Sequence, residues 1–305
     1  MEPIVELKSV TKVIRGRTII DDISFVVNKG EVFGFLGPNG AGKTTTIRMM
    51  VGLMGITSGD ITIAGASIKK HFTEAVGHVG AIVENPEMYK FMSGYDNLVH
   101  FSRMTNGVEK EKINEVVELV GLTERIHDKV KTYSLGMRQR LGLAQCLLHD
   151  PEVLILDEPT NGLDPAGIRE IRDYLRLLAR EKNMAVIVSS HLLSEMEMMC
   201  DRIGIIQNGR LVDVQLVEEF IHGADSVYEF EVVPSDTATS VLQNQGRRVT
   251  TSRKGITVQL KREEVPAAVK ELIAADVQIF GIREATKTLE DRFLEVTSEK
   301  GDVRS

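Results

Sequence analysis

Residues 31–45 read EVFGFLGPNGAGKTT, an apolar run that stops at a glycine-rich turn and leads into the helix-like segment TTIRMMVGLM. The turn fits the spacing G-x-x-x-x-G-K-[ST]. Glycines permit positive φ, so backbone N–H groups can surround an anion, and the following helix adds its positive end. A strand before and a helix after argue against a chance glycine-rich turn. The predicted phosphate-binding residues are Gly37, Pro38, Asn39, Gly40, Ala41, Gly42, Lys43, Thr44 and Thr45.

Two side chains of this loop have a chemical task. In phosphate loops the lysine, here Lys43, reaches the β- and γ-phosphates of a nucleotide. The hydroxyl that follows it, here Thr44, is a ligand of Mg²⁺. The loop therefore predicts a nucleoside triphosphate and a magnesium ion.

A second apolar strand, VLILDEP at 153–159, ends in two acids. An acid at the end of a parallel strand emerges at the carboxyl edge of the sheet, where ligands bind. Asp157 can hold Mg²⁺ through water, because magnesium keeps several of its waters. Glu158 points the other way along the strand and is placed to polarise a water that attacks the γ-phosphate. Alone, the pair could be acids in a turn; the upstream phosphate loop favours the catalytic interpretation.

His191 closes a third apolar strand, VIVSSH. A histidine at a strand end is by itself more often structural than catalytic. Here it ends a strand that could share the same sheet edge, so we interpret it as a γ-phosphate contact, mainly on the family resemblance described below.

Strands and helices alternate along most of the chain, which is typical of an α/β fold with a largely parallel sheet. Short strands are expected at 4–7 and 23–27, with the turn-rich passage RGRTIIDD between them. Residues 85–133 have helical periodicity and predict a helical subdomain. Residues 203–212 predict a hairpin around Asn208-Gly209.

The pattern restarts near residue 225. The order βαββαβ over the following segment predicts a small α+β domain of ferredoxin-like fold. We therefore divide the chain into residues 4–225 and an accessory domain, residues 226–305. A last helix is expected over TLEDRFLEV (288–296), before a polar tail that we expect to be disordered.

Composition excludes several classes of protein. The formal net charge is −7, so no basic excess is available for nucleic-acid phosphates. Cys146 and Cys200 lack metal-ligand spacing and predict buried free thiols. The N-terminus has no signal-peptide pattern, and no apolar run approaches the ~20 residues that span a bilayer. Any role at a membrane is expected to act through a partner.

Between the phosphate loop and the acidic strand lies YSLGMRQR, at 133–140. With the Walker A and Walker B motifs around it, residues 4 to about 225 resemble an ATP-binding cassette (ABC) ATPase. The order of motifs is specific: phosphate loop, helical insert, signature, Walker B, the D-loop at 161–164 and the H-loop His191. The stretch ENPEMY and the C-terminal TLEDRF are similar to bacterial drug and peptide-antibiotic exporters of the bacitracin-resistance and lantibiotic-immunity branch.

The resemblance implies further site residues. In the family, the signature serine and glycine, here Ser134 and Gly136, contact ATP bound to the other protomer. Asp164 resembles the D-loop acid that senses the opposite site. Glu84 stands where most members have a glutamine that binds Mg²⁺ and couples to the membrane partner.

Three features depart from the family pattern. Glu84 replaces glutamine, which keeps an oxygen ligand but adds a charge. Leu135 and Met137 replace the usual small and amide residues of the signature. Ile14 aligns with the aromatic residue that stacks on adenine, which suggests looser base selectivity.

The leading hypothesis is therefore the ATP-hydrolysing subunit of an exporter for a drug or peptide antibiotic. It implies ATP and Mg²⁺, a head-to-tail dimer, a separate membrane permease and a place on the cytoplasmic face of the membrane. Residues 85–101 are the expected permease contact, although their apolar side chains could equally form a small core. The alternatives are a non-transport ABC ATPase acting on nucleic acid or ribosomes, and a regulatory module with little hydrolysis. For the accessory domain, a structural role is favoured over ligand sensing.

Overall fold

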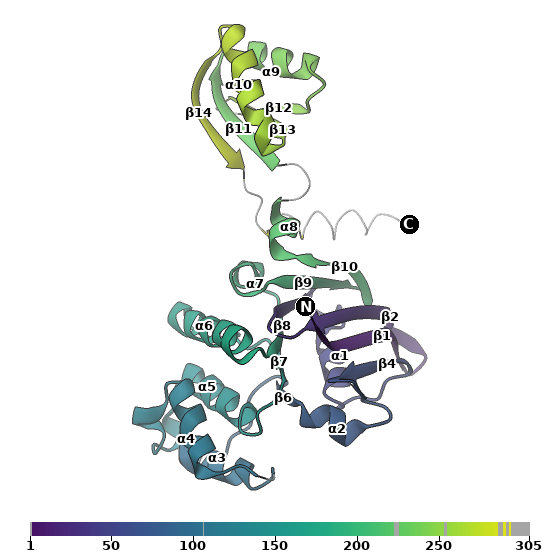
Figure 1. Cartoon of the computed structure of the whole chain (residues 1–305), viewed down its shortest axis with the longest axis vertical. Helices are drawn as coiled ribbons and strands as arrows, with labels where there is room; N and C mark the ends of the chain where they lie inside the picture. The colour runs from purple at the N-terminus through teal and green to yellow at the C-terminus, as the bar shows by residue number, and fades with distance from the viewer. Residues whose placement is uncertain are drawn as a thin grey trace. The chain divides into compact units, whose positions relative to one another are not determined.

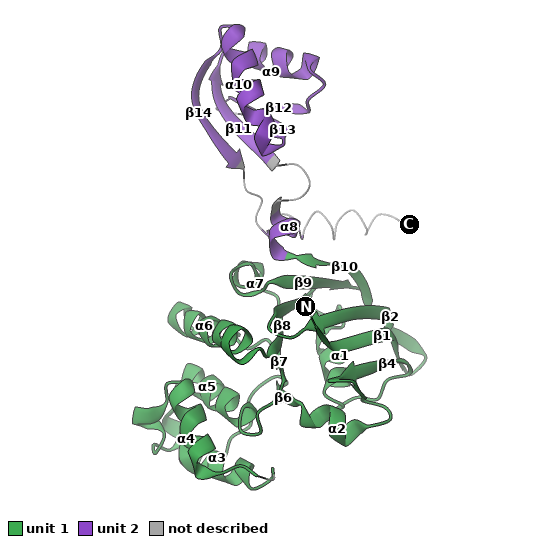
Figure 2. Ribbon diagram, viewed as in Figure 1, with its two compact units in different colours: residues 1–216 green, residues 217–305 purple. Residues whose placement is uncertain are grey.

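The chain divides into two compact units, residues 1–216 and 217–305 (Figures 1 and 2). The computed structural model describes residues 2–105, 107–222, 226–252, 255–285, 289, 290 and 293. The predicted boundary at residue 225 lies beyond α8 (Val217–His222), which groups with the second unit.

The central sheet of the first unit has the strand order β10-β9-β3-β8-β7-β6. Its strands are β3 (Val32–Leu36), β6 (Val79–Ile82), β7 (Val153–Asp157), β8 (Ala185–Ser190), β9 (Arg202–Gln207) and β10 (Arg210–Leu216). All but β10 pair in parallel. Every residue of β3, β7 and β8 is buried, which explains their continuous apolar sequences. The predicted α/β class with a mainly parallel sheet is confirmed.

The strands β9 and β10 form the predicted hairpin. Asn208 and Gly209 connect them, with φ of 50° and 77°. Positive φ at both central residues is typical of a type I′ turn, whose twist matches that of the strands.

A second, antiparallel sheet has the order β2-β1-β4-β5. Its strands are β1 (Pro3–Ile14), β2 (Arg17–Asn28), β4 (Ser58–Ile63) and β5 (Ala66–Ser67). The expected short strands at 4–7 and 23–27 are therefore wrong in extent, because most of RGRTIIDD is strand and only residues 15 and 16 turn. Register shifts interrupt the pairing of β1 with β2, and such bulges break the alternation by which a strand is recognised in sequence.

The two sheets and α1 (Lys43–Met50) share one apolar core. Phe25 of β2 stacks on Phe33 of β3 with ring centroids 5.2 Å apart. Ile47 and Met50 of α1 are fully buried in the same core. The helix that follows the glycine-rich loop is thus fixed by packing, which fixes the loop between it and β3.

Helices account for much of the remaining first unit. The predicted helical segment 85–133 contains α3, α4, η1 and η2, and α5 packs on α3 and α4. The bounds are α2 (Phe72–Gly77), α3 (Gly94–Ser102), α4 (Lys110–Leu119), η1 (Thr123–Arg125), η2 (Val130–Thr132), α5 (Leu135–Cys146), α6 (Pro165–Lys182) and α7 (Leu193–Met199). Cys146 and Cys200 are both buried and unpaired, and burial raises the pKa of each thiol.

The second unit has its own core around Phe230, Val258 and Leu272. Its antiparallel sheet has the order β12-β13-β11-β14, which is the ferredoxin-like arrangement expected from the sequence. The elements are β11 (Ser226–Val233), α9 (Ser235–Asn244), β12 (Val249–Ser252), β13 (Gly255–Leu260), η3 (Arg262–Glu264), α10 (Val265–Ala274) and β14 (Gln278–Ala285).

Most of the helix expected over 288–296, and all of the polar tail after it, lie outside the described residues. Within the described part of the chain, no helix is long and apolar enough to cross a bilayer.

Candidate active site

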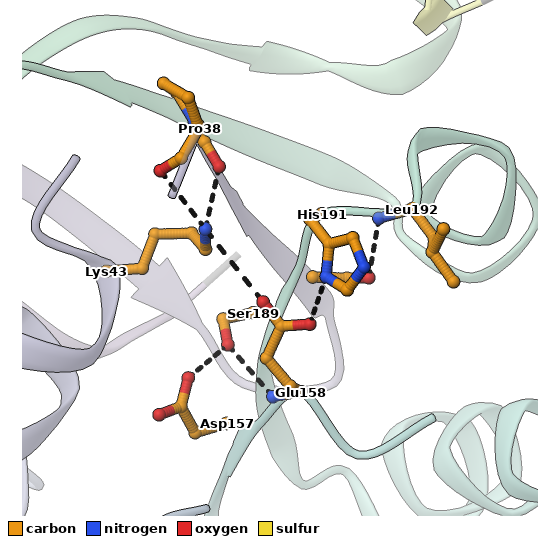
Figure 3. A network of polar contacts seen from close by, with 9 residues as sticks. Pro38, Lys43, Asp157, Glu158, Ser189, His191 and Leu192 are labelled. Carbon is orange, nitrogen blue, oxygen red and sulfur yellow. Dashed lines mark hydrogen bonds and ion pairs between the residues drawn. The ribbon is translucent and has the colours of Figure 1, made fainter. Parts of the chain in front are cut away.

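The predicted site motifs meet because three strands lie side by side. In the central sheet β8 separates β3 from β7. Leu36 is in register with Ser190, and Asp157 with Ser189. The glycine-rich loop, the acidic pair and His191 therefore leave the same edge of the sheet, although they are far apart in sequence (Figure 3).

Glycines shape the loop between β3 and α1. Gly40 and Gly42 have φ of 79° and 112°, a region that residues with a side chain avoid. A Cβ on Gly37 would lie 2.3 Å from the Ile206 carbonyl oxygen, and one on Gly42 would lie 2.4 Å from Ile20 Cδ1. Gly42 is also the N-cap of α1 and provides no side-chain cap, so the first N–H groups of α1 are suited to an anion.

Lys43 lies against this loop. Its Nζ donates hydrogen bonds to the carbonyl oxygens of Gly37 at 2.7 Å and Pro38 at 3.5 Å. The same Nζ is 3.9 Å from Glu158 Oε1. Burial lowers the pKa of Lys43, and the carboxylates of Glu158 and Asp157 oppose that shift. The lysine is thus held at the loop, with Glu158 nearby.

Glu158 lies between two basic side chains. One carboxylate oxygen faces Lys43, and the other is 2.5 Å from His191 Nδ1 (Figure 3). This hydrogen bond requires the imidazole proton on Nδ1. The backbone of Glu158 has a φ of 53°, an uncommon conformation for a residue with a side chain. The side chain therefore leaves β7 towards the loop and His191.

Ser189 is a residue of this network that the sequence patterns did not single out. Its Oγ donates to Asp157 Oδ1 at 2.6 Å and accepts from the Glu158 N–H at 3.0 Å. The side chain is fully buried. The only sequence signal is a hydroxyl two residues before the strand-end histidine, which is not distinctive without the register of β7 and β8.

A cavity of about 180 Å³ opens beside the loop. Its lining contains Asn39, Gly40, Gly42, Lys43, Thr44, Thr45, Glu158 and Ile19. Ile19 of β2 was not predicted; it is the aliphatic side chain of this wall. Ile14, the position aligned with an adenine-stacking aromatic, lies at the end of β1 outside this lining and is partly exposed.

The oxygen donors here fit a magnesium ion. The family resemblance implies Mg²⁺, and the Thr44 hydroxyl and the Asp157 carboxylate are hard oxygen ligands of the kind it prefers. Ser189 donates a hydrogen bond to Oδ1 of Asp157, and the second carboxylate oxygen does not share that bond. Among the described residues no three His, Cys, Asp or Glu side chains form a metal cluster.

Glu84 is placed differently. It follows β6 with a φ of 71°, and its exposed carboxylate pairs with Arg48 of α1. Glu84 is not in the cavity lining, so its role as a metal ligand stays a prediction.

The signature residues lie at the start of α5, outside the cavity lining. The exposed Ser134 is the N-cap of α5, where its Oγ accepts from the Met137 N–H at 3.2 Å. Leu135 lies close to the D-loop, since a Cβ added to Gly162 would be 3.1 Å from Leu135 Cδ2. Asp164 caps α6 and accepts from the Gly167 N–H at 2.8 Å.

Comparisons with known proteins agree with this geometry. Residues 20–161 match the family model described as ABC transporter. An uncharacterised ABC transporter ATP-binding protein of Bacillus subtilis, YhcH, is 64% identical and covers 98% of this chain and 97% of its own. The bacitracin transport ATP-binding protein BcrA of Bacillus licheniformis is 45% identical over 70% of each chain. A solved ATP-binding subunit of an ABC transporter superimposes with a TM-score of 0.64 at 26% identity, over 71% of this chain and 91% of that one.

Proposed function

The chain belongs to the ABC transporter ATP-binding proteins, which hydrolyse ATP to power transport, and from this premise we propose how its residues divide the task. The convergence of Lys43, Glu158 and His191 at one sheet edge carries the proposal. The comparisons give no support to the alternative of an ATPase acting on nucleic acid or ribosomes.

The glycine-rich loop binds the phosphates of ATP. Lys43 exchanges its bonds to the Gly37 and Pro38 carbonyls for the β- and γ-phosphate oxygens. Thr44 and Asp157 would hold Mg²⁺, with Glu84 as a predicted further ligand, and the ion would supply positive charge beside the phosphates.

Glu158 acts as the general base. The oxygen of a water bonds to the γ-phosphorus while one of its protons passes to the Glu158 carboxylate. The bond between the γ-phosphorus and the β–γ bridging oxygen breaks, and its electron pair stays on ADP. Such a base is typically worth about 10²–10⁴ in rate.

His191 orients the base. Its Nδ1 donates to Glu158 Oε2, which leaves Nε2 for the γ-phosphate. A bond from Nε2 to a phosphate oxygen needs a proton there as well, so the imidazolium form is the one that binds both groups at once.

The second half of the site comes from another protomer. Ser134 and Asp164 are exposed, and neither they nor Gly136 line the cavity of their own chain. A head-to-tail dimer gives them a ligand, because the start of α5 then faces the γ-phosphate held by the partner. ATP would stabilise this closed dimer, and hydrolysis would release it.

A permease contact is supported by a patch of aromatic side chains on the helical subdomain. Tyr89 and Phe91 are exposed by 41% and 71%, and Tyr89 contacts Phe91, His100 and Phe101. Exposed apolar patches of this kind mark interaction sites. Phe91→Ala should lower copurification with a coexpressed candidate permease, whereas Leu53→Ala, at 70% exposure, should not. Equal copurification of both variants would contradict this surface.

The transported class is proposed by analogy with the relatives. The match to a bacitracin transport protein supports export of a drug or peptide antibiotic through a separate permease. This subunit would act at the cytoplasmic face of the membrane, bound to that partner.

Glu158→Gln tests the assignment. Gln keeps the shape of the side chain but cannot accept the proton, so turnover should fall about 10²–10⁴-fold. ATP binding should persist, and gel filtration with ATP should show an accumulated dimer. A monomer that hydrolyses ATP at the wild-type rate would contradict the proposal.

A further inference from the structure

The hydroxyl of Ser189 bonds to both Asp157, the proposed metal ligand, and Glu158, the proposed base. Ser189 lies opposite Asp157 in the parallel pairing of β7 with β8. From there its Oγ donates to the metal-side carboxylate at 2.6 Å and accepts from the backbone N–H of the base at 3.0 Å. Both bonds are drawn in Figure 3.

The backbone of Glu158 needs such support. A residue with a side chain at positive φ is strained and persists only where its surroundings enforce it. The N–H of Glu158 is shared between the Oγ and the carbonyl oxygen of Ser189, the latter at 3.2 Å. Ser189 therefore holds the base in the conformation that directs its carboxylate between Lys43 and His191.

Asp157 is constrained by the same group. The carboxylate is nearly inaccessible to solvent, and the Ser189 hydroxyl fixes one of its two oxygens. Without that bond the carboxylate can rotate about its last torsion, because such terminal torsions are broad. The ligand oxygen would then no longer have a fixed direction.

We propose that Ser189 is a positioning residue for ATP hydrolysis, which sets the metal ligand Asp157 and the base Glu158 in fixed relation through one buried hydroxyl. The inference rests on the roles proposed above for those two acids. The neighbouring Ser190 makes no such link: its Oγ accepts from the Leu192 N–H.

The test compares Ser189→Ala with Ser189→Thr in the full chain. Alanine removes only the oxygen, whereas threonine keeps it and suits a strand. Ser102→Ala is the matched control, since Ser102 is also buried and its Oγ donates to the Val99 carbonyl oxygen within the helical subdomain. Each variant is assayed for thermal unfolding, for ATP affinity with Mg²⁺ and with a chelator, and for kcat and KM.

For Ser189→Ala we expect kcat to fall about ten- to hundredfold, the effect of losing a hydrogen bond to a charged group. ATP affinity in chelator should stay within about twofold of wild type, while the gain in affinity on adding Mg²⁺ should shrink. Ser189→Thr should restore both properties, and Ser102→Ala should change neither.

Other outcomes overturn the inference. The inference is wrong if Ser189→Ala leaves both kcat and the gain in ATP affinity on adding Mg²⁺ unchanged. It is also wrong if Ser189→Ala lowers ATP affinity equally with and without Mg²⁺, because such a loss indicates an effect on packing alone. If Ser189→Thr does not fold, the inference is tested by Ser189→Ala alone, through its ATP affinity measured with Mg²⁺ and with a chelator. Wild-type turnover in Glu158→Gln would instead refute the proposed function, so the two failures are distinguishable.

Discussion

Glu84 carries a negative charge where the resembling family has an amide, and the structure provides that charge with a partner. Its carboxylate pairs with Arg48 of α1, and both side chains are substantially exposed. An exposed ion pair contributes only about 0–1 kcal/mol to stability. The pair therefore matters less for folding than for where the Glu84 carboxylate points.

If Glu84 is a magnesium ligand, Arg48 competes with the metal for it. Arg48→Met should therefore lower the Mg²⁺ concentration that gives half-maximal hydrolysis, and Glu84→Ala should raise it. The double variant should behave like Glu84→Ala, because the arginine then has nothing to compete for. A magnesium titration of ATPase activity measures this, and an Arg48→Met curve identical to wild type would remove Glu84 from the metal site.

A single aliphatic residue also differs between the sequence prediction and the wall of the candidate nucleotide cavity. Sequence comparison directs attention to Ile14, but Ile19 of the neighbouring strand is the aliphatic side chain in the cavity wall. Ile19 belongs to a long antiparallel strand whose pairing with β1 contains bulges. No local sequence pattern predicts where such bulges occur. The predicted looser base selectivity stays a prediction.

At the scale of elements, α6 depends on Asp164. The aspartate accepts from the Gly167 N–H, and Pro165 follows at the first helical position, as is common at helix starts. The same side chain is the proposed D-loop sensor of the partner site. One residue therefore has a structural task within its chain and a proposed functional task across a dimer.

Two substitutions separate these tasks. Asp164→Ala should lower the free energy of unfolding by about 1 kcal/mol, because it removes the cap. Asp164→Asn should keep that stability, since asparagine caps equally well, but it removes the charge. We expect both to reduce ATP turnover. Denaturant unfolding and ATPase assays measure the two effects, and wild-type turnover in Asp164→Asn would leave the residue only its capping role.

Elements differ in how well the sequence predicts them. The strand β7 and its acidic end are predicted because its apolar run and its terminal carboxylates are contiguous. The hairpin at Asn208-Gly209 is predicted because its turn needs positive φ at both residues. The extents of β1 and β2 are not predicted from the sequence, since their pairing contains register shifts that depend on the partner strand.

At the scale of the whole molecule, the two units have separate apolar cores. All predicted nucleotide and metal residues belong to residues 1–216. Ligand binding to one folded unit stabilises that unit by mass action, by about 2.7 kcal/mol at a hundredfold excess over Kd.

Calorimetry of the full chain should therefore show two unfolding transitions. Mg²⁺ and ATP should raise only the transition of residues 1–216, by roughly 5–10 °C for a unit of this size. Lys43→Ala should abolish the shift, because the phosphates lose their lysine. A single transition, or an equal shift of both, would show that the two units unfold together.

The sequence by itself determined the α/β class, the ferredoxin-like second unit, the family and the candidate phosphate, metal and base residues. It could do so because these properties are local: glycine spacing, apolar runs, and acids or a histidine where a strand ends. Only the tertiary structure placed Ser189 against Asp157 and Glu158, paired Glu84 with Arg48 and put Ser134 outside the cavity of its own chain. These relations depend on register and packing between segments that are distant in sequence, for which no local pattern is required.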